Sequence, residues 1–134
     1  MIDLSTLKPG LTGSADLLVG AEHTAPRVGS GMVAVLATPV MINVIEAAAL
    51  ATVEHLLPPG HQSLGIHLDV RHFAATPVGM RVQATAELIA VDGRTLTFRV
   101  SARDEREPIG DGTHQRVVVN VARFDGRVQR KLQP

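Results

Sequence analysis

A carboxylate and an imidazole lie where the sequence around them is apolar. Glu46 is the only charged residue between Thr38 and Thr52, and ionised carboxylates are rarely buried without a partner. His72 ends a segment of alternating apolar and polar residues and falls on its aliphatic face. Because an unpaired buried polar group costs roughly 1–3 kcal/mol, we expect these two side chains to be partners. Such a pair is suited to proton transfer, since the unperturbed pKa of histidine is about 6.5.

The position of His72 follows from the alternation within residues 62–74. Successive side chains of a strand point to opposite faces, so the aliphatic face should contact the core. That face consists of Leu64, Ile66, Leu68, Val70 and His72. The other face is polar and consists of Ser63, Gly65, His67, Asp69 and Arg71. We therefore expect His72 to lie inside and His67 to lie in solvent.

Glu46 belongs to a predicted helix over Thr38–Leu57. Threonine is a good N-cap and proline is favoured at the first helical position, so Thr38 and Pro39 indicate a helix start. The sequence Pro58-Pro59-Gly60 ends the helix. Apolar side chains surround its axis, which predicts a helix buried on all sides. Since polar residues interrupt the run, we expect the core helix of a soluble protein and not a membrane span.

Composition argues against several functions. The chain has 134 residues, which is consistent with a single domain over 1–134. Its 13 basic and 13 acidic residues balance and it has no Tyr or Trp, which argues against nucleic-acid binding. It has no cysteine, which excludes disulfides, thiolate metal sites and a cysteine nucleophile, and its histidines show no metal-ligand spacing, so we expect no metal. The first residues show no secretory signal, which favours the cytoplasm.

The pattern along the chain predicts one helix and several strands. A loose lead-in (1–13) and a short strand (Ser14–Thr24) precede a Gly/Pro-rich loop and the helix. Four strands follow, and a basic tail covers 125–134. These strands are Gln62–Ala74, Met80–Val91, Arg94–Arg103 and Ile109–Phe124, with Asp92-Gly93 as a hairpin turn.

This order of elements is typical of an α+β protein. A curved antiparallel sheet of about five to six strands can surround one long buried helix only by curling around it, and that arrangement is the hotdog fold. Open sheet edges tend to be paired, so we expect a homodimer. Whether dimers pair further into tetramers is left open by the sequence.

Five short motifs between Val35 and Val128 resemble those of one enzyme family, in order and in spacing. They are Leu36–Met41, Ser63–Gly65, Ala74–Pro77, Thr85–Leu88 and Gly110–His114. The family is that of the hotdog-fold acyl-CoA thioesterases, and the chain most closely resembles the fluoroacetyl-CoA thioesterase branch. The resemblance implies an enzyme that hydrolyses acyl-CoA thioesters to free acid and CoA, with no metal or redox cofactor.

The resemblance also implies roles for five residues. Thr38, Glu46 and His72 match the family's catalytic threonine, glutamate and histidine, and strand alternation selects the same histidine independently. Gly65 and Arg116 match a glycine near the acyl group and an arginine on the last strand, so both are expected to bind substrate.

One stretch departs from the family pattern. In the fluoroacetyl-specific enzyme, phenylalanines ahead of the helix form a lid that shapes a small pocket. The equivalent stretch here, residues 22–37, is shorter and contains no aromatic residue. We therefore expect a short- or medium-chain acyl-CoA substrate and do not carry over the fluoroacetyl preference.

Each of these residues also has a purely structural interpretation. Thr38 can serve as an N-cap alone, Glu46 as a structural buried acid, and His72 as a core histidine with a satisfied hydrogen bond. Gly65 can mark a close approach or a bulge, and Arg116 can be a solvated sheet residue. The basic tail can meet the phosphates of CoA or remain a solvated terminus.

Two other functions stay open. An enoyl-CoA hydratase or dehydratase-like hotdog enzyme would use Glu46 and His72 as an acid–base pair, without a nucleophilic hydroxyl. A non-catalytic acyl-CoA-binding module would share the fold alone, because function depends on the site. The sequence also leaves open whether Thr38 or Glu46 forms a covalent intermediate.

Thr38 and Glu46 are eight residues apart, which is about 12 Å along a helix axis. Side chains at that separation do not readily touch. We therefore expect either that His72 or the substrate lies between them, or that the site is completed across the dimer interface.

Overall fold

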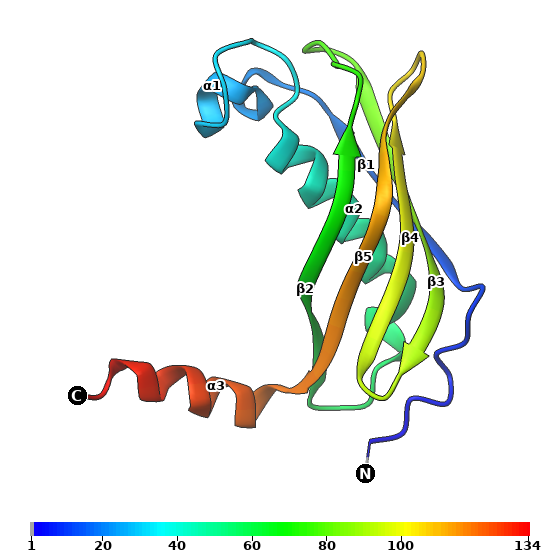
Figure 1. Cartoon of the computed structure of the whole chain (residues 1–134), viewed down its shortest axis with the longest axis vertical. Coiled ribbons are helices and arrows are strands. Elements are labelled where there is room, and N and C mark those ends of the chain that lie inside the picture. The colour runs from blue at the N-terminus through cyan, green and yellow to red at the C-terminus, as the bar shows by residue number, and fades with distance from the viewer. Residues whose placement is uncertain (1) are drawn as a thin grey trace.

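One antiparallel sheet curls along a long helix in the computed structural model, which describes residues 2–134 (Figure 1). Its strands are β1 (Thr12–Leu18), β2 (His61–His72), β3 (Arg81–Asp92), β4 (Thr95–Arg103) and β5 (Pro108–Asn120). Their order across the sheet is β1-β3-β4-β5-β2, so β1 and β2 are the two edges. This is the predicted α+β architecture, with five strands.

The middle of the sheet packs against the helix as its alternation predicts. The inward residues of β3 and β4 are almost completely buried, and burial of apolar surface stabilises the fold by about 25 cal/mol per Å². They are Val82, Ala84, Ala86, Leu88, Leu96, Phe98, Val100 and Ala102. A two-residue hairpin joins the two strands, but its turn residues are Gly93 and Arg94, one position later than the predicted Asp92-Gly93, because Asp92 pairs with Thr95. Gly93 has a positive φ of 60°, which a glycine at the first turn position allows.

The long helix is α2 (Thr38–Val53), followed by a 3-10 turn, η2 (Glu54–Leu56). One side of α2 is buried against the sheet through residues such as Met41, Ile45 and Ala48. The opposite side exposes Asn43 and Ala47. The prediction of a helix buried on all sides is therefore wrong for the single chain, because a five-stranded sheet covers only one side of the helix.

The helical stretch Thr38–Leu56 is long and apolar enough to cross a membrane by length and composition alone. A core helix passes the same test, and the buried residues of this helix pack against the curled sheet. We therefore interpret it as the core helix of the fold.

A bulge in β2 changes which side chains point inward. Gly65 pairs with Arg116 and His67 pairs with Gln115, so Ile66 is the extra residue. Ahead of the bulge the inward residues are Ser63 and Gly65, and Ser63 is buried. The predicted inward face is therefore wrong at Leu64 and Ile66.

Beyond the bulge the predicted alternation holds. Leu68, Val70 and His72 pair with residues 114, 112 and 110 of β5 and share the inward face with them. Because the extra residue shifts the alternation by one, strand parity gives the right face for His72 but not for the start of the strand.

The ends of the predicted elements also differ from the structure. β1 runs over Thr12–Leu18 rather than Ser14–Thr24, and the predicted loop contains two short helices, η1 (Ala21–His23) and α1 (Ala25–Val28). Met1 of the predicted lead-in lies outside the described residues.

The largest difference is at the C-terminal end. The last strand stops at Asn120 instead of continuing to Phe124, because the Asn120 side chain accepts a hydrogen bond from the Arg123 amide and caps a helix. That helix, α3 (Val121–Gln129), continues into η3 (Arg130–Leu132) and extends away from the sheet (Figure 1). Most of the predicted basic tail is therefore helical.

Candidate active site

Thr38 and His72 are in direct contact. The Thr38 Oγ1 atom lies 2.7 Å from the Nδ1 atom of His72. Ala37 is the N-cap of α2 and Thr38 is its first helical residue, so the expected capping role of the threonine is wrong. Because its hydroxyl makes no capping hydrogen bond, it is available to the imidazole at the N-terminal end of the helix.

Burial controls the protonation of His72. Desolvation lowers the pKa of this histidine below 6.5, while a backbone interaction with Ala74 acts weakly in the opposite direction. The ring is therefore neutral at pH 7, and with Nδ1 unprotonated the Thr38 hydroxyl donates to it. The buried Nε2 atom has no hydrogen-bond partner among the described residues. Threonine and histidine thus form a neutral hydroxyl–base pair.

A cavity of about 380 Å³ opens beside this pair. Thr38 and His72 are the polar side chains of interest on its wall, and the remainder is mainly apolar. The larger apolar residues that line it are Met32, Val33, Val35, Leu36 and Phe73. Met32 and Val33 are themselves largely exposed, so one side of the cavity opens toward solvent.

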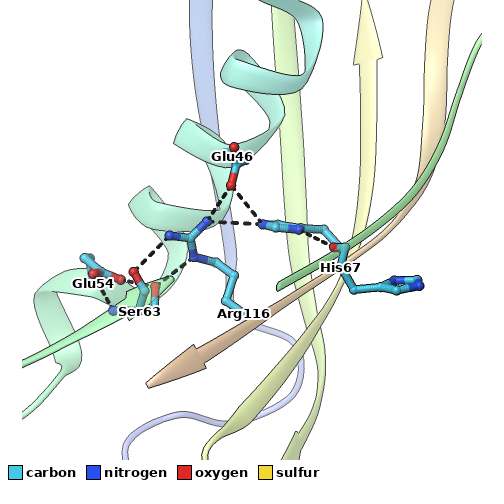
Figure 2. Close-up of polar contacts among 6 residues, drawn as sticks. Glu46, Glu54, Ser63, His67 and Arg116 are labelled. Atoms are coloured by element: carbon cyan, nitrogen blue, oxygen red, sulfur yellow. Dashed lines mark hydrogen bonds and ion pairs between the residues drawn. The ribbon is translucent and has the colours of Figure 1, made fainter. Parts of the chain in front are cut away.

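Glu46 belongs to a separate cluster formed with β5. Its Oε2 atom lies 3.2 Å from Nη1 of Arg116 (Figure 2). The same Nη1 lies 3.2 Å from Nε2 of His114. Arg116 is only 5% exposed, so the interpretation as a solvated sheet residue is wrong. The carboxylate of Glu46, which is about one-third exposed, is the partner of this guanidinium.

His114 is fully buried and neutral in this cluster. Its Nδ1 atom lies 2.8 Å from the His67 carbonyl oxygen, which can only accept, so Nδ1 carries the proton. Nε2 is then an acceptor for Arg116. Burial lowers the pKa of His114, and the 3.8 Å approach of its Nε2 to Glu46 is therefore not an ion pair.

Gly65 provides the space for the carboxylate. A Cβ atom at this position would collide with Oε2 of Glu46 and would lie 3.2 Å from Cε1 of His114. The structure thus gives this glycine a close-approach role, and it brings Gly65, Glu46 and Arg116 together as neighbours.

The expected contact between Glu46 and His72 is absent from the described chain, where His72 bonds to Thr38 and Glu46 bonds to Arg116. The five predicted site residues therefore form two groups, called half-sites below: Thr38 with His72, and Glu46 with Arg116 and Gly65. Within residues 2–134, no cluster of three or more His, Cys, Asp or Glu side chains is arranged to hold a metal ion.

Three residues that surround the second half-site are not predicted from the sequence: His114 and Ser63, which bond to Arg116, and Glu54, which bonds to Ser63. His114 was set aside because it lacks metal-ligand spacing, although the alternation of β5 places it on the same face as Arg116. Ser63 is predicted on the polar face because the alternation is counted without a bulge, although Gly65 is a possible bulge position and the structure has the bulge directly after it. Glu54 lies near the helix end, where a charged residue is ordinarily solvated.

The fold places the chain among the thioesterase-superfamily hotdog proteins. A member of that superfamily from Thermus thermophilus is 25% identical, with a TM-score of 0.87 over 94% of this chain and 93% of its own. A hot-dog-like protein from Thermanaerovibrio acidaminovorans, at 21% identity and a TM-score of 0.88, shares the fold. The predicted hotdog fold is confirmed.

Sequence comparison identifies the branch. The fluoroacetyl-CoA-specific thioesterase family matches residues 19–122. The fluoroacetyl-CoA thioesterase of Streptantibioticus cattleyicolor is 44% identical over 97 residues, which are 72% of this chain and 70% of that protein. A structure of the fluoroacetyl-CoA thioesterase FlK is 36% identical, with a TM-score of 0.88 over 93% of this chain and 97% of its own. The chain belongs to the fluoroacetyl-CoA-specific thioesterase family.

Proposed function

We propose that the protein hydrolyses short- or medium-chain acyl-CoA thioesters to a free acid and CoA. Membership of the thioesterase family supports the reaction. The observation that carries the proposal is the 2.7 Å contact between the Thr38 hydroxyl and the neutral His72 ring, on the wall of an apolar cavity. A structure of a FlK variant with fluoroacetate and CoA, 36% identical to this chain, supports a CoA thioester as the substrate class.

The Thr38–His72 pair suits attack on a thioester carbonyl. As Oγ1 bonds to the carbonyl carbon, its proton passes to Nδ1 of His72. The free amides and positive dipole end at the start of α2 favour the oxyanion that develops. When the C–S bond breaks, the imidazolium returns the proton to the departing thiolate of CoA. Water then cleaves the acyl ester by the same proton route in reverse order, releasing the acid and restoring the hydroxyl.

Glu46 is the anionic member of the proposed catalytic set. It can favour the imidazolium form of a nearby His72 or orient the attacking water. Within one chain, the cluster around Glu46 lies about two helical turns from Thr38. This role therefore requires a second copy of the chain, which brings its Glu46 close to His72. Gly65 and Arg116, which line the Glu46 carboxylate, are proposed to bind the acyl thioester from the same side.

A homodimer supplies that arrangement. The edge of β2 is unpaired, and Leu64, Ile66 and Leu68 on this strand are 38%, 53% and 42% exposed. The uncovered side of α2 lies next to Glu46, so a second copy added at β2 would cover an apolar edge and a helix face together. We propose that Glu46 of one chain then meets Thr38 and His72 of the partner. Pairing of such dimers into tetramers is not required.

We propose the acyl specificity from the residues that line the cavity. Residues 22–37 contain no aromatic side chain, and the exposed Met32 and Val33 lie at its rim. The unbranched side chain of Met32 can adapt to a range of acyl chains, so a strict fluoroacetyl preference is not expected. We further propose that the enzyme acts in the cytoplasm and needs neither metal nor redox cofactor.

A panel of acyl-CoA substrates tests the function. Purified protein is incubated with acetyl- to decanoyl-CoA, crotonyl-CoA and a thiol reagent that reports free CoA. We expect CoA release from saturated short or medium chains. Release from no substrate would contradict the hydrolase, and binding without release would favour an acyl-CoA-binding module. Loss of the crotonyl double bond without CoA release, retained in Thr38→Ala, would favour a hydratase.

The dimer has its own test. Ile66→Asp places a charge on the exposed bulge of β2, away from the side chains of both half-sites. We expect the variant to elute as a monomer in size-exclusion chromatography with light scattering. A dimer of unchanged mass would contradict an interface at this edge.

A further inference from the structure

We propose that Glu54 and Ser63 are positioning residues, which fix the guanidinium of Arg116 and through it the carboxylate of Glu46. The proposal rests on the proposed function for its catalytic consequence. Figure 2 shows Arg116 lying between Ser63 and Glu46, with Glu54 beyond the serine.

The hydrogen bonds of Ser63 run in one direction. Its hydroxyl lies 2.6 Å from Oε1 of Glu54, and a carboxylate can only accept, so the hydroxyl proton points toward Glu54. The remaining lone pair accepts from Nε of Arg116 at 2.8 Å. The backbone amide of Ser63 donates to the other oxygen of Glu54 at 2.8 Å. Glu54 therefore sets the rotamer and the proton direction of the serine.

Ser63 in turn sets the plane of the guanidinium. Arg116 donates Nε–H to the hydroxyl of Ser63 and an Nη2 proton to its carbonyl oxygen at 3.0 Å. These two parallel bonds aim Nη1 at Glu46 and His114, each 3.2 Å away. A planar guanidinium that is held at Nε and Nη2 cannot rotate, so the direction of its Nη1 atom is fixed.

Burial makes the arrangement sensitive to the loss of one acceptor. Ser63 is 4% exposed and Arg116 is 5% exposed. Without the serine hydroxyl, the Nε–H group would be left buried and unpaired. The guanidinium would gain by turning toward water or toward Glu46, and either movement displaces the carboxylate from its place beside Gly65.

A purely structural role would look different. Glu54 also joins η2 to the start of β2, so its loss is expected to lower stability as well as activity. Positioning through Arg116 predicts in addition that the effects of the two residues on kcat are not independent, because both act through one guanidinium. It also predicts a local change at Arg116 itself.

The test measures kcat, KM and the ¹⁵N–¹H signal of the Arg116 Nε–H group, assigned by its loss in Arg116→Lys. Ser63→Ala is expected to lower kcat about tenfold and Glu54→Gln about fivefold, with KM changed less than about twofold. The double variant should stay near tenfold rather than reach fiftyfold. The Nε–H signal should shift in each. Glu54→Gln keeps one acceptor for Ser63 and serves if Ser63→Ala fails to fold.

Matched controls are Glu107→Gln and Ser101→Ala, which change the same residue types on exposed positions of the turn after β4 and of β4 itself. Both should keep the kcat and the Nε–H signal of the original protein. Multiplicative losses in the double variant, or an unchanged kcat with a shifted signal, would overturn the proposal. A wild-type protein that releases no CoA would instead contradict the proposed function, and the signal would still report the positioning of Arg116.

Discussion

The two half-sites differ in how firmly they are held. Thr38 and His72 share one hydrogen bond beside an open apolar cavity, and within residues 2–134 the second nitrogen of the ring has no partner. Arg116 makes four hydrogen bonds, to the hydroxyl and carbonyl of Ser63, to Glu46 and to His114. The first half-site is neutral and free to meet a substrate, whereas the second is charged and fixed. In the proposed mechanism, proton movement belongs to the first half-site and orientation of charge to the second.

The largest expected effect comes from breaking the open half-site. Thr38→Ala removes the hydroxyl that bonds to His72 without changing a cap, since Ala37 is the N-cap. We expect kcat to fall by about 10²–10⁴-fold, in the range typical of acid–base and nucleophilic groups. Thr38→Ser should keep most of the activity. Turnover by Thr38→Ala within about threefold of the original would remove this half-site from the mechanism.

A smaller effect is expected from crowding the fixed half-site. In Gly65→Ala the new methyl group meets Oε2 of Glu46, which must move away from Arg116. We expect kcat to fall about 10- to 100-fold, as for a misplaced catalytic group. Steady-state kinetics and a crystal structure of the variant measure both consequences. An unmoved carboxylate with full activity would show that this glycine has no role at the site.

The smallest expected effect is on stability, and it tests the neutral state of His114 beside the charged pair of the second half-site. Burial lowers the pKa of His114, so the unfolded chain binds more protons than the folded chain below pH 6.5. The stabilising contribution of the neutral ring is complete above pH 6.5 and is lost as the pH falls toward the lower folded-state pKa. The urea midpoint, at fixed protein concentration, should therefore fall between pH 7.5 and pH 5.5.

His114→Asn should reduce that fall, although His72, whose pKa is lowered in the same direction, will keep part of it. His55→Asn, at an exposed position of η2, is the matched control and should leave the fall unchanged. An identical pH dependence in the original protein and in His114→Asn would contradict the neutral, buried state of this ring.

Much of the fold could be predicted because its signals are local. The start of the helix, the alternation of β3 and β4 and the turn at Gly93 each depend on residues close in sequence. Resemblance then identified the branch and the class of enzyme, an acyl-CoA thioester hydrolase, which the family comparisons confirm. The C-terminal helix was missed because the apolar run through Val121 is equally compatible with a longer strand.

The site was predicted less completely because its geometry depends on contacts between distant residues. The structure places Thr38 and His72 in contact, whereas the partner expected for the histidine was Glu46. Gly65 indicated a possible bulge, but the predicted alternation did not include one, so Ser63 and Gly65 were predicted on the wrong face. The pairing of a carboxylate with Arg116, rather than with an imidazole, is decided by the register between β2 and β5, which alternation alone does not give.

The central claim is that one working site combines the open half-site of one chain with the fixed half-site of its partner. It is tested most directly by co-expressing Thr38→Ala and Glu46→Gln chains with different tags and purifying the mixed population. Random pairing gives heterodimers in half of the molecules, each with one complete site of two, so about one quarter of the original activity should return. Activity no greater than that of the two parent variants, in a sample shown by tag capture to contain heterodimers, would contradict the account.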